Sequence, residues 1–142
     1  MHLFDLFLSA IKISSFAGVA RGEYSMKNDT SAKISILGTE YTVEKKNPWE
    51  DAALQTRYGY CDSTTKRIVI ANLVPEPGSG INELPAVGRL LRHEIIHGFL
   101  YESGLDDNSD WACDEELVDW IALQFPKLQT AFEQAGCIIQ GA

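Results

Sequence analysis

Two of the three histidines in this chain lie four positions apart, in the run His93-Glu94-Ile95-Ile96-His97. The run falls inside a stretch whose pattern predicts a helix. Residues four apart on a helix lie one turn apart on the same face, so both imidazoles should point the same way, with Glu94 beside them. The opposite face is apolar and should pack against a core; it carries Ile95, Ile96, Phe99 and Leu100.

This spacing suits a catalytic metal centre. Two imidazoles one turn apart can bind one tetrahedral ion, and Zn²⁺ accepts such nitrogen ligands. Glu94 cannot easily reach the same ion, but it can accept a proton from an attacking water molecule. Chance occurrence of the motif is the competing interpretation, and the placement of two of only three histidines at this spacing argues against it. The sequence therefore predicts one Zn²⁺ per chain, with Glu94 as the general base.

A third metal ligand should come from the acidic run that follows. A catalytic zinc keeps three protein ligands and one open position. Glu115 and Asp119 lie one turn apart on a predicted helix, so Glu115 can bind the metal while Asp119 holds a histidine through its other ring nitrogen. Glu116 lies farther round that helix, and the choice between the two glutamates stays open. The competing interpretation, acidic residues that favour a helix N-terminus, fits Glu116 better than Asp119.

Peptide hydrolysis also needs a donor for the developing oxyanion. Tyr101 lies one turn beyond His97 on the same predicted face, and Tyr60 is a second candidate. An ordinary half-buried core position is the competing interpretation for both tyrosines. Trp111 and Trp120 are expected to lie in the core.

The first half of the chain predicts a small, mostly antiparallel sheet of three or four strands. Residues 34–45 form two β-type runs around Gly38-Thr39, which is typical of a hairpin. Residues 57–62 and 67–71 predict two further strands, joined by turn-forming residues. The Pro/Gly segment 74–82 is expected to be a surface loop.

Three helices should follow the sheet, which makes the fold class α+β. The first covers residues 84–102 and carries the histidines. The second should run from about residue 110 to 124, where Pro126 ends it. The third should run from Pro126 to about Ala135, just before Gly136.

Length and charge bound the organisation of the chain. Its 142 residues fit one domain, predicted at residues 26–142. Residues 1–25 are expected to be an N-terminal extension of uncertain structure. Asp5 and Lys12 interrupt its apolar stretch, so a signal peptide or a membrane span fits poorly. The net charge of −8 argues against nucleic acid as a partner. Three scattered cysteines predict a reduced, cytoplasmic protein.

The combined motifs resemble a known group. His93-Glu94-Xaa-Xaa-His97, followed by Glu115 and Asp119, resembles the gluzincin arrangement of zinc peptidases. Residues 91–105 and 115–122 are similar to small phage- and prophage-encoded metallopeptidase-domain proteins, the minimal zincins of the ImmA/IrrE type. The resemblance covers about residues 33–137. This chain has Glu115-Glu116 where that family has Glu-Ala.

The resemblance implies a short sheet packed on an active-site helix and a glutamate helix, a single zinc and a cytosolic setting. The expected function is zinc-dependent hydrolysis of peptide bonds in a protein or peptide substrate, associated with a phage or prophage. One alternative is a non-catalytic zinc-containing binding module that acts on a host or phage regulator. Glu94 argues against it, because a structural site needs no base and usually closes its fourth position. Another alternative is a protease dedicated to one repressor-like partner.

Overall fold

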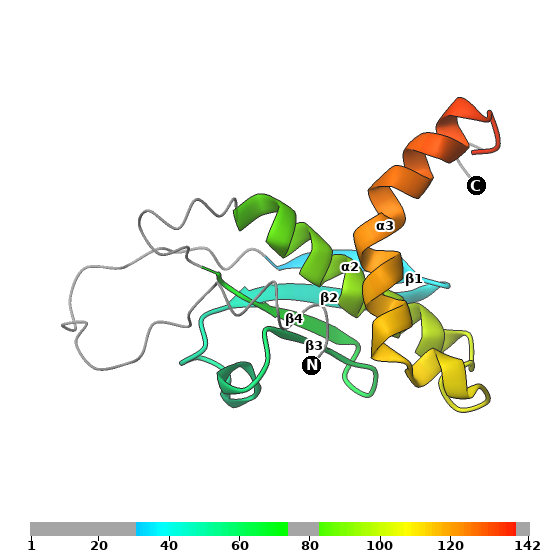
Figure 1. The fold of residues 1–142 in the computed structure, drawn as a ribbon. Coiled ribbons are helices and arrows are strands. Elements are labelled where there is room, and N and C mark those ends of the chain that lie inside the picture. Colours follow the sequence, from blue (N-terminus) through cyan, green and yellow to red (C-terminus); the bar gives the residue numbers. More distant parts are fainter. Residues whose placement is uncertain (1–30, 74–82, 139–142) are drawn as a thin grey trace.

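The computed structural model describes residues 31–73 and 83–138, within which strands precede helices (Figure 1). The predicted extension at residues 1–25 and the predicted loop at 74–82 lie outside these residues. The expectation of an α+β fold is confirmed. In chain order the elements are β1 (Ala32–Ile36), β2 (Thr39–Lys46), the 3-10 helix η1 (Ala52–Gln55), β3 (Gly59–Asp62), β4 (Arg67–Ala71), α2 (Glu83–Glu102), the 3-10 helix η2 (Asp110–Cys113) and α3 (Glu115–Gln134).

The four strands form one mixed sheet in the order β1-β2-β4-β3. The two outer pairs, β1–β2 and β3–β4, are antiparallel, but the central pair β2–β4 is parallel. The prediction of a mostly antiparallel sheet therefore holds only for the outer pairs. The segment that contains η1 reverses the direction of the chain, so β3 runs antiparallel to β2. The turn between β3 and β4 reverses it again, and β4 therefore runs parallel to β2. As a result β3 lies at one edge of the described sheet.

The predicted β1–β2 hairpin is confirmed, with its turn one residue earlier than expected. Ile36 pairs with Thr39, which leaves a two-residue loop of Leu37 and Gly38. Both loop residues have positive φ, 47° and 88°. Two successive positive φ angles are typical of the type I′ turn, whose twist matches that of a β-hairpin.

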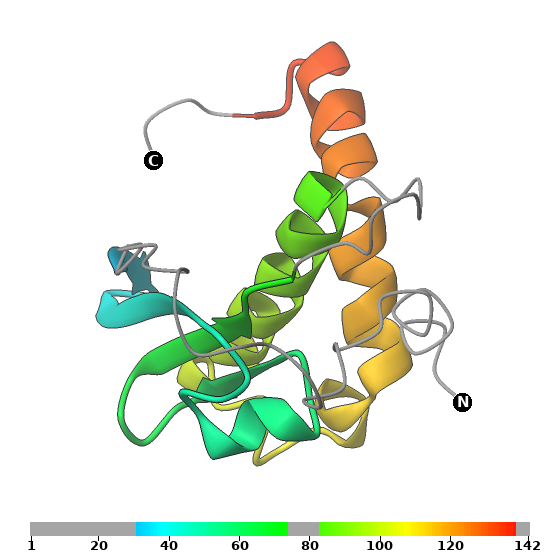
Figure 2. The ribbon, with the colours of Figure 1, turned by 90° about the vertical axis from the view of Figure 1, so that its left-hand side faces the viewer.

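Helix α2 packs on the sheet with one face and against α3 with another, so it lies between them (Figure 2). Its buried apolar residues, Ala86, Val87 and Leu90, precede the histidines on the face toward the sheet. The prediction that the face opposite the motif meets the core is wrong for Phe99, which is 42% exposed. His93 and Glu94 of the motif are themselves buried, His93 against Asp119 of α3 and Glu94 on the side of α2 toward β3. The core comprises Ile36, Tyr41, Val43, Leu54, Ile68, Val69, Ile70, Ala71, Leu73, Ala86, Val87 and Leu90.

A glycine sets how closely α2 approaches the hairpin. A Cβ atom at Gly98 would lie 2.7 Å from Cδ1 of Ile36, closer than atoms pack. Gly98 therefore lets the side chain of Ile36 pack directly against the helix backbone, one residue after His97.

The two helices predicted at residues 110–124 and 126–135 are in fact one helix, α3, preceded by the 3-10 turn η2. The helix begins at Glu115 because Asp114 is its N-cap: the Asp114 carboxylate accepts hydrogen bonds from the backbone N–H groups of Glu116 and Leu117 at 2.9 and 3.2 Å. The prediction that Pro126 ends the helix is wrong, and Pro126 lies inside it.

The reason lies on the neighbouring helix. Proline has no N–H, so the carbonyl four residues earlier, that of Ala122, loses its helical partner. Nε of Arg92 in α2 donates a hydrogen bond of 2.7 Å to this carbonyl. The buried acceptor is thereby satisfied, and the helix continues past the proline.

Trp111 and Trp120 were expected in the core, but they are 49% and 54% exposed. The buried residues of α3 are Val118, Asp119 and Ala122, which form the side that faces α2. Trp120 lies off this narrow side. Among the described residues, neither long helix is long and apolar enough to cross a membrane.

The C-terminal end of α2 is tied to the sheet by one carboxylate. Glu102 accepts hydrogen bonds from Thr39 Oγ1 at 2.9 Å, Tyr41 OH at 2.7 Å and Lys66 Nζ at 2.6 Å. These partners come from β2 and the β3–β4 turn. The hydrogen bonds of Lys66 and Tyr41 lower the pKa of Glu102 to about 2.

The substitution Arg92→Met tests the compensation at Pro126. It should lower the free energy of unfolding by about 2 kcal/mol, because a buried carbonyl loses a charged donor. In a Pro126→Ala background the new N–H can bond Ala122, so the loss should shrink. Urea unfolding of the four proteins in this cycle measures the difference, and an equal loss in both backgrounds would contradict the explanation.

The Glu102 cluster predicts a pH dependence of stability. A carboxyl group whose pKa falls on folding stabilises the fold above its unfolded pKa, and this contribution disappears as the pH drops toward the folded value. Glu102→Gln should therefore be less stable than wild type at pH 7. The gap should narrow between the ordinary pKa of 4.5 and about 2. Urea unfolding at pH 7 and pH 3 tests this, with Glu40→Gln, an exposed glutamate on β2, as the control.

Candidate metal centre

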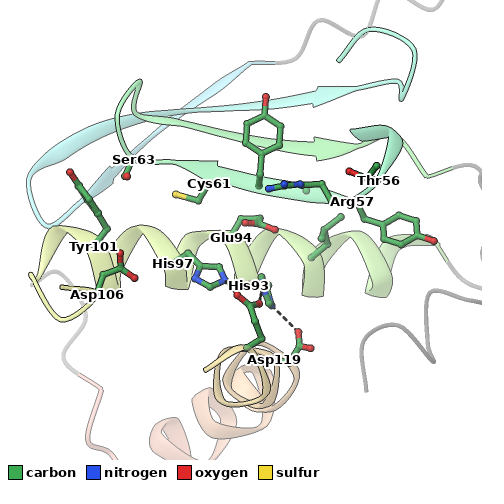
Figure 3. A pocket seen from close by; sticks show the side chains of 15 residues that line it. Thr56, Arg57, Cys61, Ser63, His93, Glu94, His97, Tyr101, Asp106 and Asp119 are labelled. Atoms are coloured by element: carbon green, nitrogen blue, oxygen red, sulfur yellow. Dashed lines mark hydrogen bonds and ion pairs between the residues drawn. The ribbon is translucent and has the colours of Figure 1, made fainter. Parts of the chain in front are cut away.

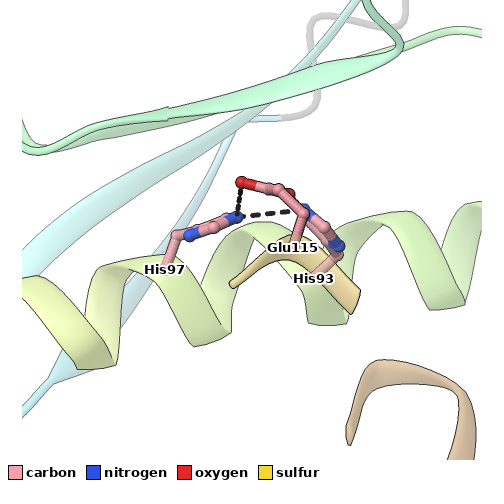
Figure 4. Close-up of side chains that lie close together, drawn as sticks. All are labelled: His93, His97 and Glu115. Atoms are coloured by element: carbon pink, nitrogen blue, oxygen red, sulfur yellow. Dashed lines mark hydrogen bonds and ion pairs between the residues drawn. The ribbon is translucent and has the colours of Figure 1, made fainter. Parts of the chain in front are cut away.

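Three side chains from two helices converge on one point (Figure 4). Nε2 of His93 lies 3.0 Å from Nε2 of His97. The Glu115 carboxylate places Oε2 3.1 Å from Nε2 of His93 and Oε1 3.4 Å from Nε2 of His97. The histidines come from successive turns of α2, and Glu115 is the first residue of α3. These three residues could hold a metal ion.

The separations match the size of a coordination shell. Ligands at about 2.0–2.1 Å from a tetrahedral ion lie about 3.3 Å from one another. The three observed separations of 3.0, 3.1 and 3.4 Å are close to that value. The donor set of two imidazoles and one carboxylate is also one that catalytic zinc sites use. The prediction of Glu115 agrees with this geometry, whereas Glu116 lies outside the group.

Asp119 holds His93 in the orientation that a ligand needs. Nδ1–H of His93 donates a hydrogen bond of 2.8 Å to Oδ1 of Asp119, and both residues are buried. With the proton on Nδ1, the lone pair of Nε2 points toward His97 and Glu115. The role predicted for Asp119 thus has its contact in the structure.

The charges of the site are coupled. Burial alone would lower the pKa of His93, but the carboxylates of Glu115, Glu94 and Asp119 outweigh it and raise that pKa. When the imidazoles are protonated, their hydrogen bonds to the Glu115 carboxylate hold the pKa of Glu115 well below its ordinary range, whereas metal binding needs the neutral form with the Nε2 lone pair free. Three carboxylates around two imidazoles favour a cationic occupant.

Glu94 lies in the same cleft without joining the three ligands. Its side chain is on the side of α2 that faces the sheet and is 6% exposed (Figure 3). Burial raises the pKa of Glu94, while the charges of His93, His97 and Arg57 oppose the rise. A carboxylate with a raised pKa beside a metal centre can both accept and return a proton.

The close approach of Glu94 to β3 depends on Gly59. A Cβ atom there would lie 3.0 Å from Oε1 of Glu94, 3.2 Å from Cδ1 of Leu90 and 3.2 Å from the backbone oxygen of Val69. A side chain at this position would therefore force Glu94, Leu90 or the strand backbone to shift by a few tenths of an ångström.

The three ligands and Glu94 line a cleft of about 480 Å³ between α2 and β3 (Figure 3). Sequence reasoning missed several of its residues, among them Arg57, Cys61 and Asp106. A signal for two of them was present: Arg57, Gly59 and Cys61 alternate along one strand and so share a face. Asp106 follows α2 in a loop, and no local pattern indicates its position.

The two tyrosine candidates lie in different environments. Tyr101 lines the cleft and is 38% exposed, with Nζ of Lys66 4.8 Å from its ring centroid. The hydroxyl of Tyr60 donates a hydrogen bond of 2.6 Å to Asp51, and burial together with this bond raises the pKa of Tyr60 to about 12. Since Tyr60 alternates with Gly59 and Cys61 on β3, its side chain lies on the opposite face of the strand. Tyr101 is the better placed of the two.

Comparisons of the chain with protein-family models, with curated proteins and with solved structures found no match.

The contact between Asp119 and His93 predicts a specific effect on metal affinity. Asp119→Asn should weaken Zn²⁺ binding by about 10- to 100-fold, because the tautomer and orientation of His93 are then less well held. His93→Ala should abolish binding. Competition with a chromophoric chelator measures the affinity, and Glu116→Gln serves as the matched control that should leave it unchanged. Equal affinities for wild type and Asp119→Asn would rule out this role.

Proposed function

We propose that the protein is a zinc-dependent metallo-endopeptidase that hydrolyses peptide bonds in a protein or peptide substrate. The observation that carries the proposal is the position of Glu94. This buried carboxylate shares a cleft with three convergent ligands and lies outside the ligand group. A purely structural zinc site has no use for such a group and closes its fourth position with another ligand.

The roles of the residues follow from their positions. His93, His97 and Glu115 would hold the ion, and Asp119 orients His93 through the 2.8 Å hydrogen bond. A bound Zn²⁺ would activate water and polarise the scissile carbonyl. Glu94 takes the proton of the attacking water and returns it to the leaving amine. Tyr101 donates to the developing oxyanion from the edge of the cleft.

The sheet supplies a way to bind an extended peptide. β3 is at the edge of the described sheet, and Gly59, Tyr60 and Cys61 line the cleft. A peptide that adds to this edge makes backbone hydrogen bonds with little demand on its sequence. Such pairing would place the scissile bond beside Glu94.

The proposal extends to the kind of protein. A short sheet on an active-site helix, with a glutamate helix beyond it, is the packing that the resemblance to the ImmA/IrrE minimal zincins implies. The order sheet, α2, α3 and the ligand set of two histidines and Glu115 support this zincin-like assignment. A phage or prophage association and a cytoplasmic location are part of the same proposal.

Glu94→Gln tests the mechanism. The variant should bind Zn²⁺ as wild type does, because Glu94 is not a ligand, and should lose hydrolysis by about 10²- to 10⁴-fold, because the general base is gone. Metal analysis and cleavage of a fluorescent casein measure the two properties. Glu116→Gln, an exposed glutamate of α3, should keep both. Full activity in Glu94→Gln would exclude Glu94 as the base.

A protease dedicated to one partner would leave casein intact. In that case immobilised, zinc-loaded Glu94→Gln should retain the partner, and wild type should then cleave the captured protein. Capture without any cleavage would instead favour the non-catalytic binding module.

A further inference from the structure

The cleft carries opposite charges at its two ends. Among the described residues that line it, Arg57 is the one lysine or arginine, and the other charged lining residues are acidic: Glu94, Asp106, Glu115 and Asp119. Arg57 lies at one end, and Asp106 lies near Tyr101 at the other (Figure 3). The metal ligands and Glu94 lie between them. A peptide bound along the cleft would therefore meet a positive charge on one side of its scissile bond and a negative charge on the other.

Arg57 is placed to contact a bound peptide. It lies two residues before β3 and lines the cleft together with Gly59 and Cys61. Its guanidinium points along the cleft toward Glu94 (Figure 3). The residue is exposed, and within residues 31–73 and 83–138 its guanidinium makes no hydrogen bond or ion pair. The planar guanidinium can bind a carboxylate through two parallel N–H donors.

The direction of β3 decides which side of the substrate meets Arg57. The strand runs from Gly59, at the Arg57 end, to Asp62. Antiparallel pairing is the slightly more stable arrangement of two strands. A peptide antiparallel to β3 would place its C-terminal part beside Arg57 and its N-terminal part toward Asp106.

We propose that Arg57 determines specificity by binding a carboxylate of the substrate on the C-terminal side of the scissile bond. The carboxylate belongs to an acidic side chain one or two residues beyond that bond; a preference for the free C-terminus of the substrate would instead make the protein a carboxypeptidase. This inference rests on the proposed function, since it takes the metal centre as the position of the scissile carbonyl. It adds the class of substrate that the proposed function leaves open.

Peptide hydroxamates test the proposal, because the hydroxamate binds a catalytic zinc and thereby fixes where the following residues lie. The probes are succinyl-hydroxamate peptides with Glu, Gln or Lys at the first or the second residue after the zinc-binding group, all with an amide C-terminus. A further Gln probe has a free C-terminal carboxylate. Calorimetry with the zinc-loaded full chain measures their affinities, so the readout does not depend on turnover.

Wild type should bind a Glu probe about three- to tenfold more tightly than its neutral Gln counterpart, as expected for a partly exposed charge-assisted pair, and the Lys probe most weakly. The free-carboxylate probe separates an acidic side chain from a free C-terminus as the source of the carboxylate. Arg57→Gln should remove the preference, and Arg57→Glu should reverse it in favour of Lys. Lys45→Glu, which makes the same charge change at an exposed position outside the cleft, should preserve it.

Two results would overturn the inference: equal affinity of wild type for the acidic, neutral and basic probes, or an equal loss for every probe in Arg57→Gln. Both would leave the metal centre intact, because the hydroxamates still bind. Failure of every hydroxamate to bind zinc-loaded wild type would instead overturn the proposed function. The two failures are therefore distinguishable.

Discussion

The buried hydrogen bond between His93 and Asp119 joins the packing of two helices to the geometry of three candidate metal ligands. Breaking a buried polar pair leaves groups without partners and costs more than the pair contributes, so α2 and α3 are held in one register. Glu115 lies one turn before Asp119 on α3, and His97 lies one turn after His93 on α2. The contact that orders the two helices thus also brings the remaining two ligands together.

The local spacing predicted that His93 and His97 share one face of a helix, because residues four apart lie one turn apart. It left Glu115 and Glu116 open as the third candidate ligand, and the structure brings Glu115 to the two histidines. The strand at residues 67–71 was predicted with its bounds, since a continuous apolar run between turn residues has few alternatives. The parallel central pair of the sheet could not be predicted this way. It depends on where the chain returns after η1, and no local pattern carries that information.

The error at Pro126 has a similar origin. The rule that proline ends a helix considers only the helix that contains the proline. The compensating hydrogen bond comes from Arg92 on another helix, thirty positions before the Ala122 carbonyl that accepts it. Local patterns likewise do not show which distant segments pack on a residue. For this reason Asp106 was missed as part of the cleft, and the exposed Trp111 and Trp120 were assigned to the core. Among the described residues α3 packs mainly against α2, so its buried side is narrower than its apolar residues suggest.

The cleft has two walls of different origin. All three ligands and Asp119 come from α2 and α3, whereas the facing wall is built by β3 and the residues just before it. The missing side chain of Gly59 makes room for Glu94. None of the residues of the strand wall belongs to the group that could hold a metal ion. Apart from Gly59 and from Arg57, whose charge acts on Glu94, the residues of this wall can therefore vary without altering the group that could hold the ion. In this way one candidate metal centre could be combined with strand walls of different shape and charge.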